Sequence, residues 1–304
     1  MKIVSLLPSA TEIVYALGLG DQLAGVTYEC DYPPEARSKP VVSDTALPQD
    51  RPLTAREVDD LVTGFMDRGE PIYVLDKDLI RRIQPDLILV QDLCKVCAVP
   101  SGQVEDALKD LGSDATVVSL DPSTVDEVIE CIVTVGRATG TEERAAGLAA
   151  GLRARVERVR RRALPLPTIG TLCLEWSDPP FVAGHWVPGM VEIGGGANLL
   201  ATPGQPSRKI GWRQVAEAAP EVVVFMPCGY YLEDAEPEAE GLFRVYDFLD
   251  TPAARSGDVF AVDATSYFSR PGPRIVDGLE ILAWAIHPDA FPEPPPGSIV
   301  RVTG

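Results

Sequence analysis

The chain has 304 residues, of which 45% are hydrophobic and 24% charged, so it is long enough for two globular domains of ordinary size. Its formal net charge of −18 argues against nucleic acid or an anionic membrane as a partner, because both bind basic surfaces. No apolar run reaches the ~18 residues that span a bilayer, so membrane insertion is not expected.

The first 28 residues predict a strand, a helix and a second strand. Residues 2–6 are β-rich, and Ser9 or Thr11 is a candidate N-cap for the helix that follows. Residues 24–28 have the composition of the next strand. A helix that begins just after a strand is a frequent ligand-binding position in α/β proteins.

The alternation of strands and helices continues to residue 122. Residues 54–68 have the apolar spacing of an amphipathic helix, and residues 72–75, 87–91 and 115–120 are strand-like. This βαβ order predicts a first α/β domain, residues 1–122, with a mostly parallel sheet covered by helices.

A helical segment, residues 123–165, separates this domain from a second one. Residues 141–163 run without a strong breaker from a Glu-rich start to an Arg-rich end, which suits the helix dipole. Strand–helix alternation then resumes over residues 166–290, and residues 291–304 form a Pro-rich tail. We therefore predict two Rossmann-like α/β lobes with parallel sheets, joined by a single long backbone helix, with the ligand cleft between them.

Four of the six cysteines follow predicted strands: Cys30, Cys94, Cys97 and Cys228. Loops after parallel strands share one edge of a sheet, so these thiolates could converge on an iron–sulfur cluster or a tetrahedral zinc ion. In the alternative interpretation they are unconnected small residues lining a pocket. The other two, Cys131 and Cys173, lie in apolar runs and predict buried, inert thiols.

No nucleophile with its base and no phosphate-binding loop stands out, so we do not expect an enzyme. His185, in the string AGHW after a short predicted strand, is the most informative single residue. Two roles fit it: an axial ligand to cobalt or iron, or a hydrogen-bond partner of the ligand or the backbone.

Several segments in a fixed order resemble one known family: LLPSATEIVYALGLGDQLAGVTYECDYPPEA, IQPDLILV, PPFVAGHWVPGMVEIGGGANLL, GWRQVAEAAPEVVVF and SYFSRPGPRIVDGLEIL. The chain resembles the helical-backbone (class III) substrate-binding proteins of ABC transporters, and most closely their cobalamin-binding members. The resemblance implies a small-molecule ligand, cobalamin or another corrinoid, in the interlobe cleft. It implies ligand contacts from Ser9, Tyr28, Asp31, Tyr32, Trp176, His185, Trp186, Trp212, Tyr267 and Phe268.

The sequence departs from this family in two respects. Family members dock on a permease through one acidic residue per lobe; Asp78 fits the first position, whereas Arg213 occupies the second. The first predicted strand follows Met1 directly, without a secretory signal. Both departures favour a cytoplasmic binding protein whose docking on an ABC permease is doubtful; the alternative is a periplasmic or extracellular protein whose leader is not part of this sequence.

Overall fold

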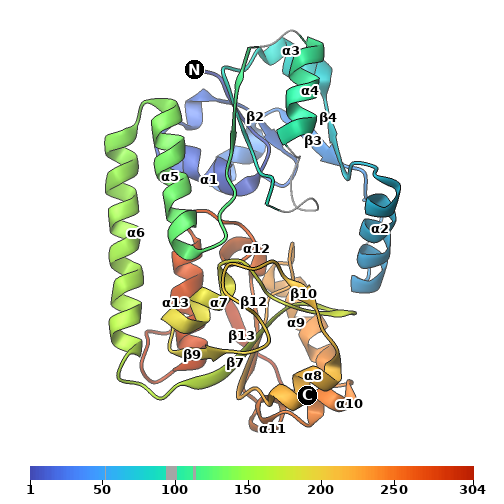
Figure 1. The fold of residues 1–304 in the computed structure, drawn as a ribbon, viewed down its shortest axis with the longest axis vertical. Coiled ribbons are helices and arrows are strands. Elements are labelled where there is room, and N and C mark those ends of the chain that lie inside the picture. Colours follow the sequence, from blue (N-terminus) through green and yellow to red (C-terminus); the bar gives the residue numbers. More distant parts are fainter. Residues whose placement is uncertain (52, 94–100, 112–113) are drawn as a thin grey trace. The chain divides into compact units, whose positions relative to one another are not determined.

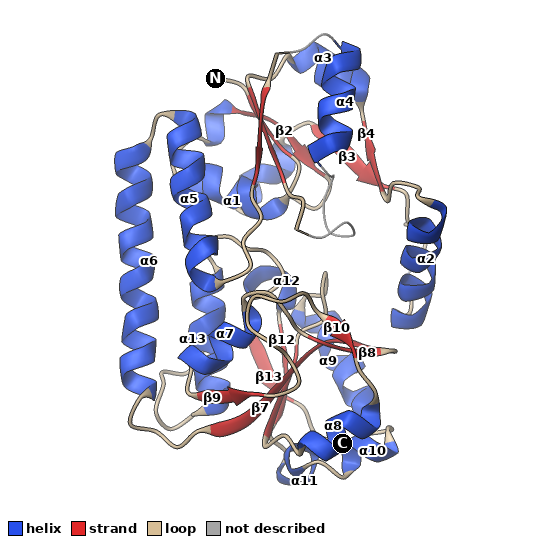
Figure 2. Cartoon of the chain, in the orientation of Figure 1, coloured by secondary structure: helices blue, strands red, loops and turns tan. Residues whose placement is uncertain are grey.

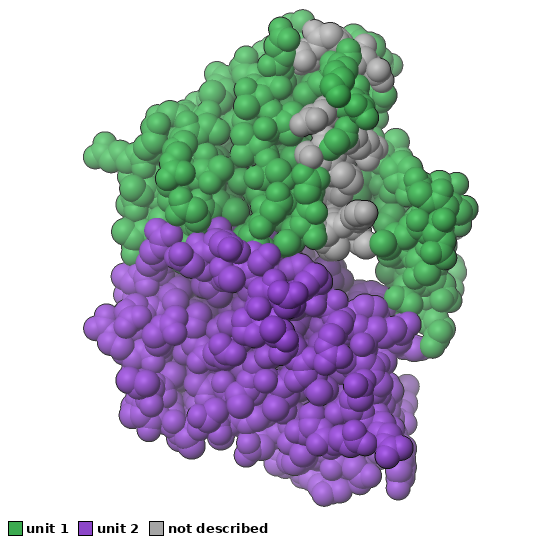
Figure 3. Space-filling view, in the orientation of Figure 1, with its two compact units in different colours: residues 1–122, 129–150 green, residues 123–128, 151–304 purple. Residues whose placement is uncertain are grey.

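The computed structural model describes residues 1–51, 53–93, 101–111 and 114–304. Two compact units divide the chain (Figure 3): unit 1 comprises Met1–Pro122 and Ile129–Ala150, and unit 2 comprises Ser123–Val128 and Gly151–Gly304. Each unit has its own sheet with helices around it, and the central strands of both sheets are parallel (Figures 1 and 2). The predicted α/β fold with two lobes is therefore confirmed.

Unit 1 is built on a six-stranded sheet in the order β4-β3-β2-β1-β5-β6. All neighbours pair in parallel except β3 and β4, which are antiparallel. The strands are short and apolar, and the central ones are buried, as expected for a sheet covered on both faces. They are β1 (Ile3–Ser5), β2 (Leu23–Thr27), β3 (Val41–Thr45), β4 (Tyr73–Leu75), β5 (Leu87–Val90) and β6 (Thr116–Ser119).

The helices of unit 1 connect successive strands, as the βαβ pattern predicts. They are α1 (Pro8–Ala16), α2 (Ala55–Arg68), α3 (Lys77–Ile83) and α4 (Ser101–Leu111), with short 3₁₀ turns at Gly20–Gln22 and Pro34–Ser38. The N-cap of α1 is Leu7, which makes no side-chain cap bond, so the prediction of Ser9 or Thr11 as the cap was wrong. Pro8 at the first helical position needs no hydrogen-bond partner for its nitrogen, which makes a side-chain cap less necessary.

Unit 2 is built on a seven-stranded sheet in the order β10-β8-β7-β11-β12-β13, with β9 pairing separately with β7. Strands β7, β11 and β12 are parallel, whereas β8, β10 and β13 pair antiparallel. The strands are β7 (Ile169–Ser177), β8 (Pro180–Val182), β9 (Gly196–Asn198), β10 (Arg208–Lys209), β11 (Val222–Phe225), β12 (Val259–Val262) and β13 (Ile299–Arg301).

Strand β13 corrects the prediction of a separate C-terminal tail, because residues 299–301 pair with β12 as the edge of this sheet. The helices of unit 2 pack on both sides of the same sheet. They are α7 (Val187–Ile193), α8 (Trp212–Ala218), α9 (Leu232–Leu242), α10 (Tyr246–Leu249), α11 (Pro252–Ser256), α12 (Ala264–Tyr267) and α13 (Ile275–Ile286).

The predicted long helix is present as α6 (Glu142–Ala163), and α5 (Val125–Thr139) precedes it. Residues of both helices are divided between the two units. Within unit 1 the two helices approach closely: a Cβ added at Gly136 would lie 2.4 Å from the Cβ of Ala145. Only glycine therefore fits at position 136 without moving its neighbour.

The second half of α6 is held in unit 2 by Arg155. Its guanidinium group donates to both carboxylate oxygens of Glu280, at 3.0 and 2.7 Å, and to Asp277. These charge-assisted bonds to α13 raise the pKa of Arg155, and a forked donor facing carboxylates fixes orientation as well as distance.

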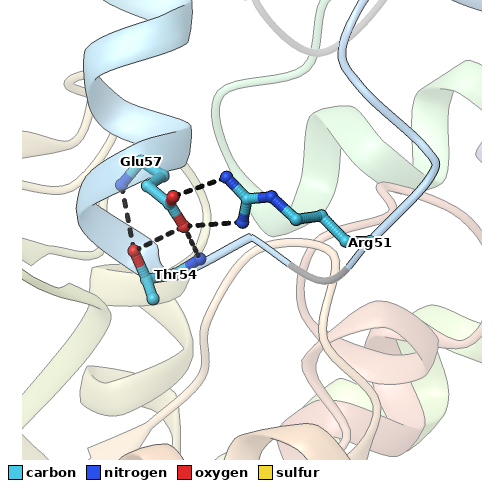
Figure 4. Close-up of polar contacts among 3 residues, drawn as sticks. All are labelled: Arg51, Thr54 and Glu57. Atoms are coloured by element: carbon cyan, nitrogen blue, oxygen red, sulfur yellow. Dashed lines mark hydrogen bonds and ion pairs between the residues drawn. The ribbon is translucent and has the colours of Figure 1, made fainter.

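Helix α2 begins with a capping box that Arg51 extends (Figure 4). The Thr54 hydroxyl accepts from the Glu57 amide at 3.3 Å, while a Glu57 carboxylate oxygen accepts from the Thr54 amide at 2.9 Å. Arg51 donates to both Glu57 oxygens, at 2.6 and 3.2 Å. Hydrogen bonds from Arg51 and then Thr54 lower the pKa of Glu57 to about 2.

Two helical glycines should respond oppositely to replacement by alanine. Gly136→Ala should destabilise the protein by about 1–3 kcal/mol because its Cβ overlaps Ala145. Gly147→Ala in α6, where a Cβ meets nothing within 4 Å, should stabilise it by about 0.5–1 kcal/mol. Urea denaturation monitored by circular dichroism measures both; effects of the same sign would contradict the close packing of α5 and α6.

An NMR titration of the Glu57 carboxylate should give a pKa of about 2. Because the folded pKa lies below the ordinary value, the contribution of Glu57 to stability is complete at neutral pH and is lost as the pH falls through the folded pKa. Arg51→Ala should raise this pKa towards the ordinary value while leaving the capping box, and an unchanged pKa in that variant would refute the role of Arg51.

Candidate ligand-binding site

Parallel strands end at a common edge, and the predicted ligand residues of unit 1 follow β1 and β2 at this edge. Tyr28 and Tyr32 expose 37% and 45% of their surface, whereas Ser9, in the first turn of α1, is 98% buried (2% exposed). Asp31 is paired with Arg37 at 3.6 Å. The two tyrosines are thus the predicted contacts with the most surface available to a ligand.

Tyr28 carries an uncharged phenol at neutral pH. Burial of part of the ring, followed by the nearby Glu29 carboxylate, raises its pKa well above the ordinary value. Its hydroxyl donates to Glu29 at 3.2 Å. The ring therefore offers an apolar face while its polar end remains bonded within the protein.

Cys30 lies inside unit 1 rather than at the surface of the edge, with 3% of its area exposed. Its sulfur lies 3.0 Å from the Thr11 hydroxyl, which in turn donates to Ser5 at 2.9 Å. Ser5 donates to the carbonyl of Leu7, so this chain of polar contacts joins β1, α1 and the loop after β2. Thr11, one of the two residues predicted to cap α1, therefore takes part in a tertiary network.

The predicted convergence of four thiols remains untested. Cys94 and Cys97 lie outside the described residues, and Cys228 is exposed in unit 2. Among the described residues no group of three histidines, cysteines or acids is placed to hold a metal ion. Cys131 and Cys173 are buried, as predicted, and burial raises the pKa of the Cys173 thiol.

In unit 2 an aromatic pair lies at the carboxyl ends of β7 and β11. The ring of Trp176 meets that of Tyr230 in a T-shaped contact, with centroids 5.7 Å apart. The amide of Thr265, which follows β12, donates to the Tyr230 carbonyl at 3.0 Å. The sequence analysis missed Tyr230, although it follows β11 in the same loop as Cys228 and the same signal could have found it.

His185, Trp186 and Phe268 form a second group in unit 2. The rings of His185 and Trp186 lie 5.7 Å apart and are tilted by 31°, and the Trp186 indole donates to the Phe268 carbonyl at 2.9 Å. Trp186 and Phe268 expose 7% and 2% of their surface, whereas His185 is half-buried. The two aromatic residues hold the start of α7 against the end of α12, so His185 has more surface available to a ligand than they do.

The remaining two predicted contacts also pack within unit 2. Trp212, the first residue of α8, meets Phe248 in a T-shaped contact at 6.1 Å beside the hydrophobic core. Tyr267 is half-buried and faces the guanidinium group of Arg274, 5.9 Å from its ring centroid. A role in ligand binding stays a prediction for all ten residues.

Unit 1 also contains a hollow of about 910 Å³ near the carboxyl end of β5. Its walls come from the end of α2, from β4 and from α4, and include Met66, Tyr73, Gln91 and Asp92. None of the ten predicted ligand residues lines it. The hollow is therefore separate from the edge positions after β1 and β2.

Residues 3–265 match the family model described as "Periplasmic binding protein". The chain belongs to the periplasmic binding protein family. The class of protein implied by the resemblance is thereby confirmed, and so is the expectation of a substrate-binding protein rather than an enzyme.

Of three proteins similar to the chain, one is named for no ligand, one for vitamin B12 and one for heme. The chain is 26% identical over 295 residues to the uncharacterized ABC transporter substrate-binding lipoprotein YvrC of Bacillus subtilis, covering 96% of this chain and 82% of that protein. It is 25% identical over 283 residues to a vitamin B12-binding protein of Vibrio cholerae, covering 92% and 86%. The periplasmic heme-binding protein RhuT from Roseiflexus sp. RS-1, in apo form, superimposes with a TM-score of 0.71 at 25% identity, covering 95% and 98%.

Location and permease docking remain predictions for this periplasmic binding protein. In the described part of the chain, no helix combines the length and the apolar character needed to cross a membrane. Relatives are named as lipoproteins or periplasmic proteins, and nothing supports the predicted cytoplasmic location. Arg213 is 86% exposed and pairs with Glu217 at 2.9 Å, while Asp78 is 77% exposed and pairs with Arg81.

The burial of the cysteines predicts their reactivity with a thiol reagent. Under native conditions Cys228 should be alkylated by iodoacetamide, whereas Cys30, Cys131 and Cys173 should stay protected until the protein is denatured. Peptide mapping by mass spectrometry measures each site separately. If Cys30 reacts as fast as Cys228, its place in the buried hydroxyl network is wrong.

Proposed function

We propose that the chain binds a corrinoid, cobalamin or a close relative of it, through the residues at the carboxyl edges of its two sheets. The observation that carries the proposal is the T-shaped pair of Trp176 and Tyr230 at the edge of unit 2. A corrin ring is broad and apolar, so it suits aromatic contacts of this kind, and its amide arms suit a few polar groups beside them.

The charge of the chain favours a corrinoid over heme. Heme carries two propionates, and a chain with a net charge of −18 repels an anionic ligand unless local cations compensate. At the edge of unit 1, Arg37 is already paired with Asp31. The amide arms of a corrinoid are neutral and avoid this repulsion, and the relationship to a vitamin B12-binding protein supports the same choice.

A cysteine-ligated iron–sulfur cluster or zinc ion is the alternative hypothesis, and no described feature favours it. The visible spectrum of the purified protein separates the two. A corrinoid gives sharp characteristic bands, an iron–sulfur cluster gives broad absorption, and zinc gives none. Iron, sulfide and zinc determination after anaerobic purification completes this test.

Removal of the Trp176 ring should weaken corrinoid binding. Trp176→Ala should weaken the binding of cyanocobalamin by about 1–3 kcal/mol. Isothermal titration calorimetry measures this loss as a higher dissociation constant. Tyr246→Ala is the matched control, because this ring is 79% exposed on α10 and should leave binding unchanged. Wild-type protein that binds hemin but not cyanocobalamin would refute the proposal, as would equal effects of the two variants.

A further inference from the structure

His185 occupies a backbone conformation that the surrounding chain imposes. Its φ of +53° lies in the left-handed region, which non-glycine residues seldom adopt. The backbone is fixed on both sides: its amide donates to the Gln205 carbonyl at 2.6 Å, and its carbonyl accepts from the Gly204 amide at 3.0 Å. Unfavourable backbone geometry that is held in this way concentrates at functional sites.

Gly184, the residue before His185, allows two loops to pack closely against each other. A Cβ added at Gly184 would lie 2.3 Å from the backbone nitrogen of Ser207, and the Gly184 amide donates to the Ser207 hydroxyl at 3.1 Å. The backbone of residues 184–185 therefore packs directly against that of residues 204–207. This contact leaves the imidazole little freedom, because its backbone is fixed and Trp186 lies beside the ring.

The two ring nitrogens of His185 have different surroundings. Nδ1 is buried and has no hydrogen-bond partner among the described residues. Nε2 does not belong to the buried polar atoms that lack a partner. Burial also lowers the pKa of the imidazole, so the ring is neutral at pH 7 and carries one proton. The question is which nitrogen holds that proton.

A proton on Nδ1 would be a buried N–H group without an acceptor, which is unfavourable because the group loses its hydration without gaining a hydrogen bond. A proton on Nε2 leaves only an unpaired acceptor at Nδ1, and unpaired buried donors are the rarer of the two in proteins. A histidine that binds a metal through Nε2 needs its proton on Nδ1, and such histidines almost always donate that proton to a neighbour. No described group offers that acceptor.

We propose that His185 binds the ligand as an Nε2–H hydrogen-bond donor to an oxygen of the ligand, and not as an axial ligand to its metal. The oxygen acceptor of an amide arm is the kind of group this donor recognises. The inference rests on the proposed function and deepens it, because it assigns recognition to the periphery of the corrinoid. Binding through His185 should then be independent of the upper ligand on cobalt.

Two substitutions test the role because their amide groups mimic different ring nitrogens. In His185→Gln the side-chain nitrogen falls near the position of Nε2, and in His185→Asn it falls near Nδ1. The affinity of His185→Gln for cyanocobalamin should stay within about threefold of the wild-type value. The affinity of His185→Asn should fall about tenfold, which corresponds to the loss of one hydrogen bond. Since Asn tolerates the left-handed backbone better than Gln, a purely structural role predicts the reverse order.

Two spectroscopic measurements complete the test. Nitrogen-15 NMR of the ligand-free protein, in which only His185 and His287 contribute imidazole signals, should show the Nε2–H tautomer for the signal that His185→Asn removes. Aquocobalamin, whose cobalt-bound water an imidazole can replace, should bind without a change in its visible spectrum that depends on His185.

Each result has one meaning. The Nδ1–H tautomer, a spectral shift that His185→Gln abolishes, or equal affinities of all three proteins would overturn the assignment of His185 while wild-type binding remains intact. Absence of corrinoid binding to the wild-type protein would instead overturn the proposed function, and with it the ligand contact, whereas the NMR result still decides the tautomer.

Discussion

Parallel pairing of the central strands is the constraint on which the candidate site depends. In unit 1 the strands β1, β2 and β5 run in the same direction, and in unit 2 so do β7, β11 and β12. The loops that follow them must therefore emerge at one edge of each sheet. Tyr28 and Trp176 are far apart in the sequence, yet each follows or ends a strand at such an edge. In each unit such a candidate ligand residue therefore lies at a strand end, and the buried part of the strand belongs to the core.

The fold could be predicted because its signals are local. Short apolar runs bounded by turns gave the central strands, and an unbroken run of helix formers with an Arg-rich end gave α6. Strand β13 was not predictable in this way. Its three residues lie in a Pro-rich segment, and they become a strand only because the edge of β12 is available for antiparallel pairing.

The site was predictable only in part, since exposure depends on tertiary contacts that a sequence does not show. Trp176 and Trp186 look equivalent in the sequence, as aromatic residues after strand-like runs. In the structure one lies half-buried at a strand end against Tyr230, while the other is buried and bonded to the carbonyl of Phe268. Thr11 shows the same limit. Its spacing predicts a helix cap, but the nearness of Cys30 and Ser5 gives its hydroxyl a tertiary partner instead.

Two of the predicted ligand contacts, Tyr28 and His185, are uncharged at neutral pH. Burial raises the pKa of Tyr28 and lowers that of His185, so a phenol and an imidazole both stay neutral. A neutral donor loses less hydration energy than a charged one when a large apolar ligand covers it. It also gives no advantage to an anionic competitor. In a chain with a net charge of −18, the Nε2–H donor proposed for His185 would therefore suit a ligand rimmed with neutral acceptors better than an anionic one.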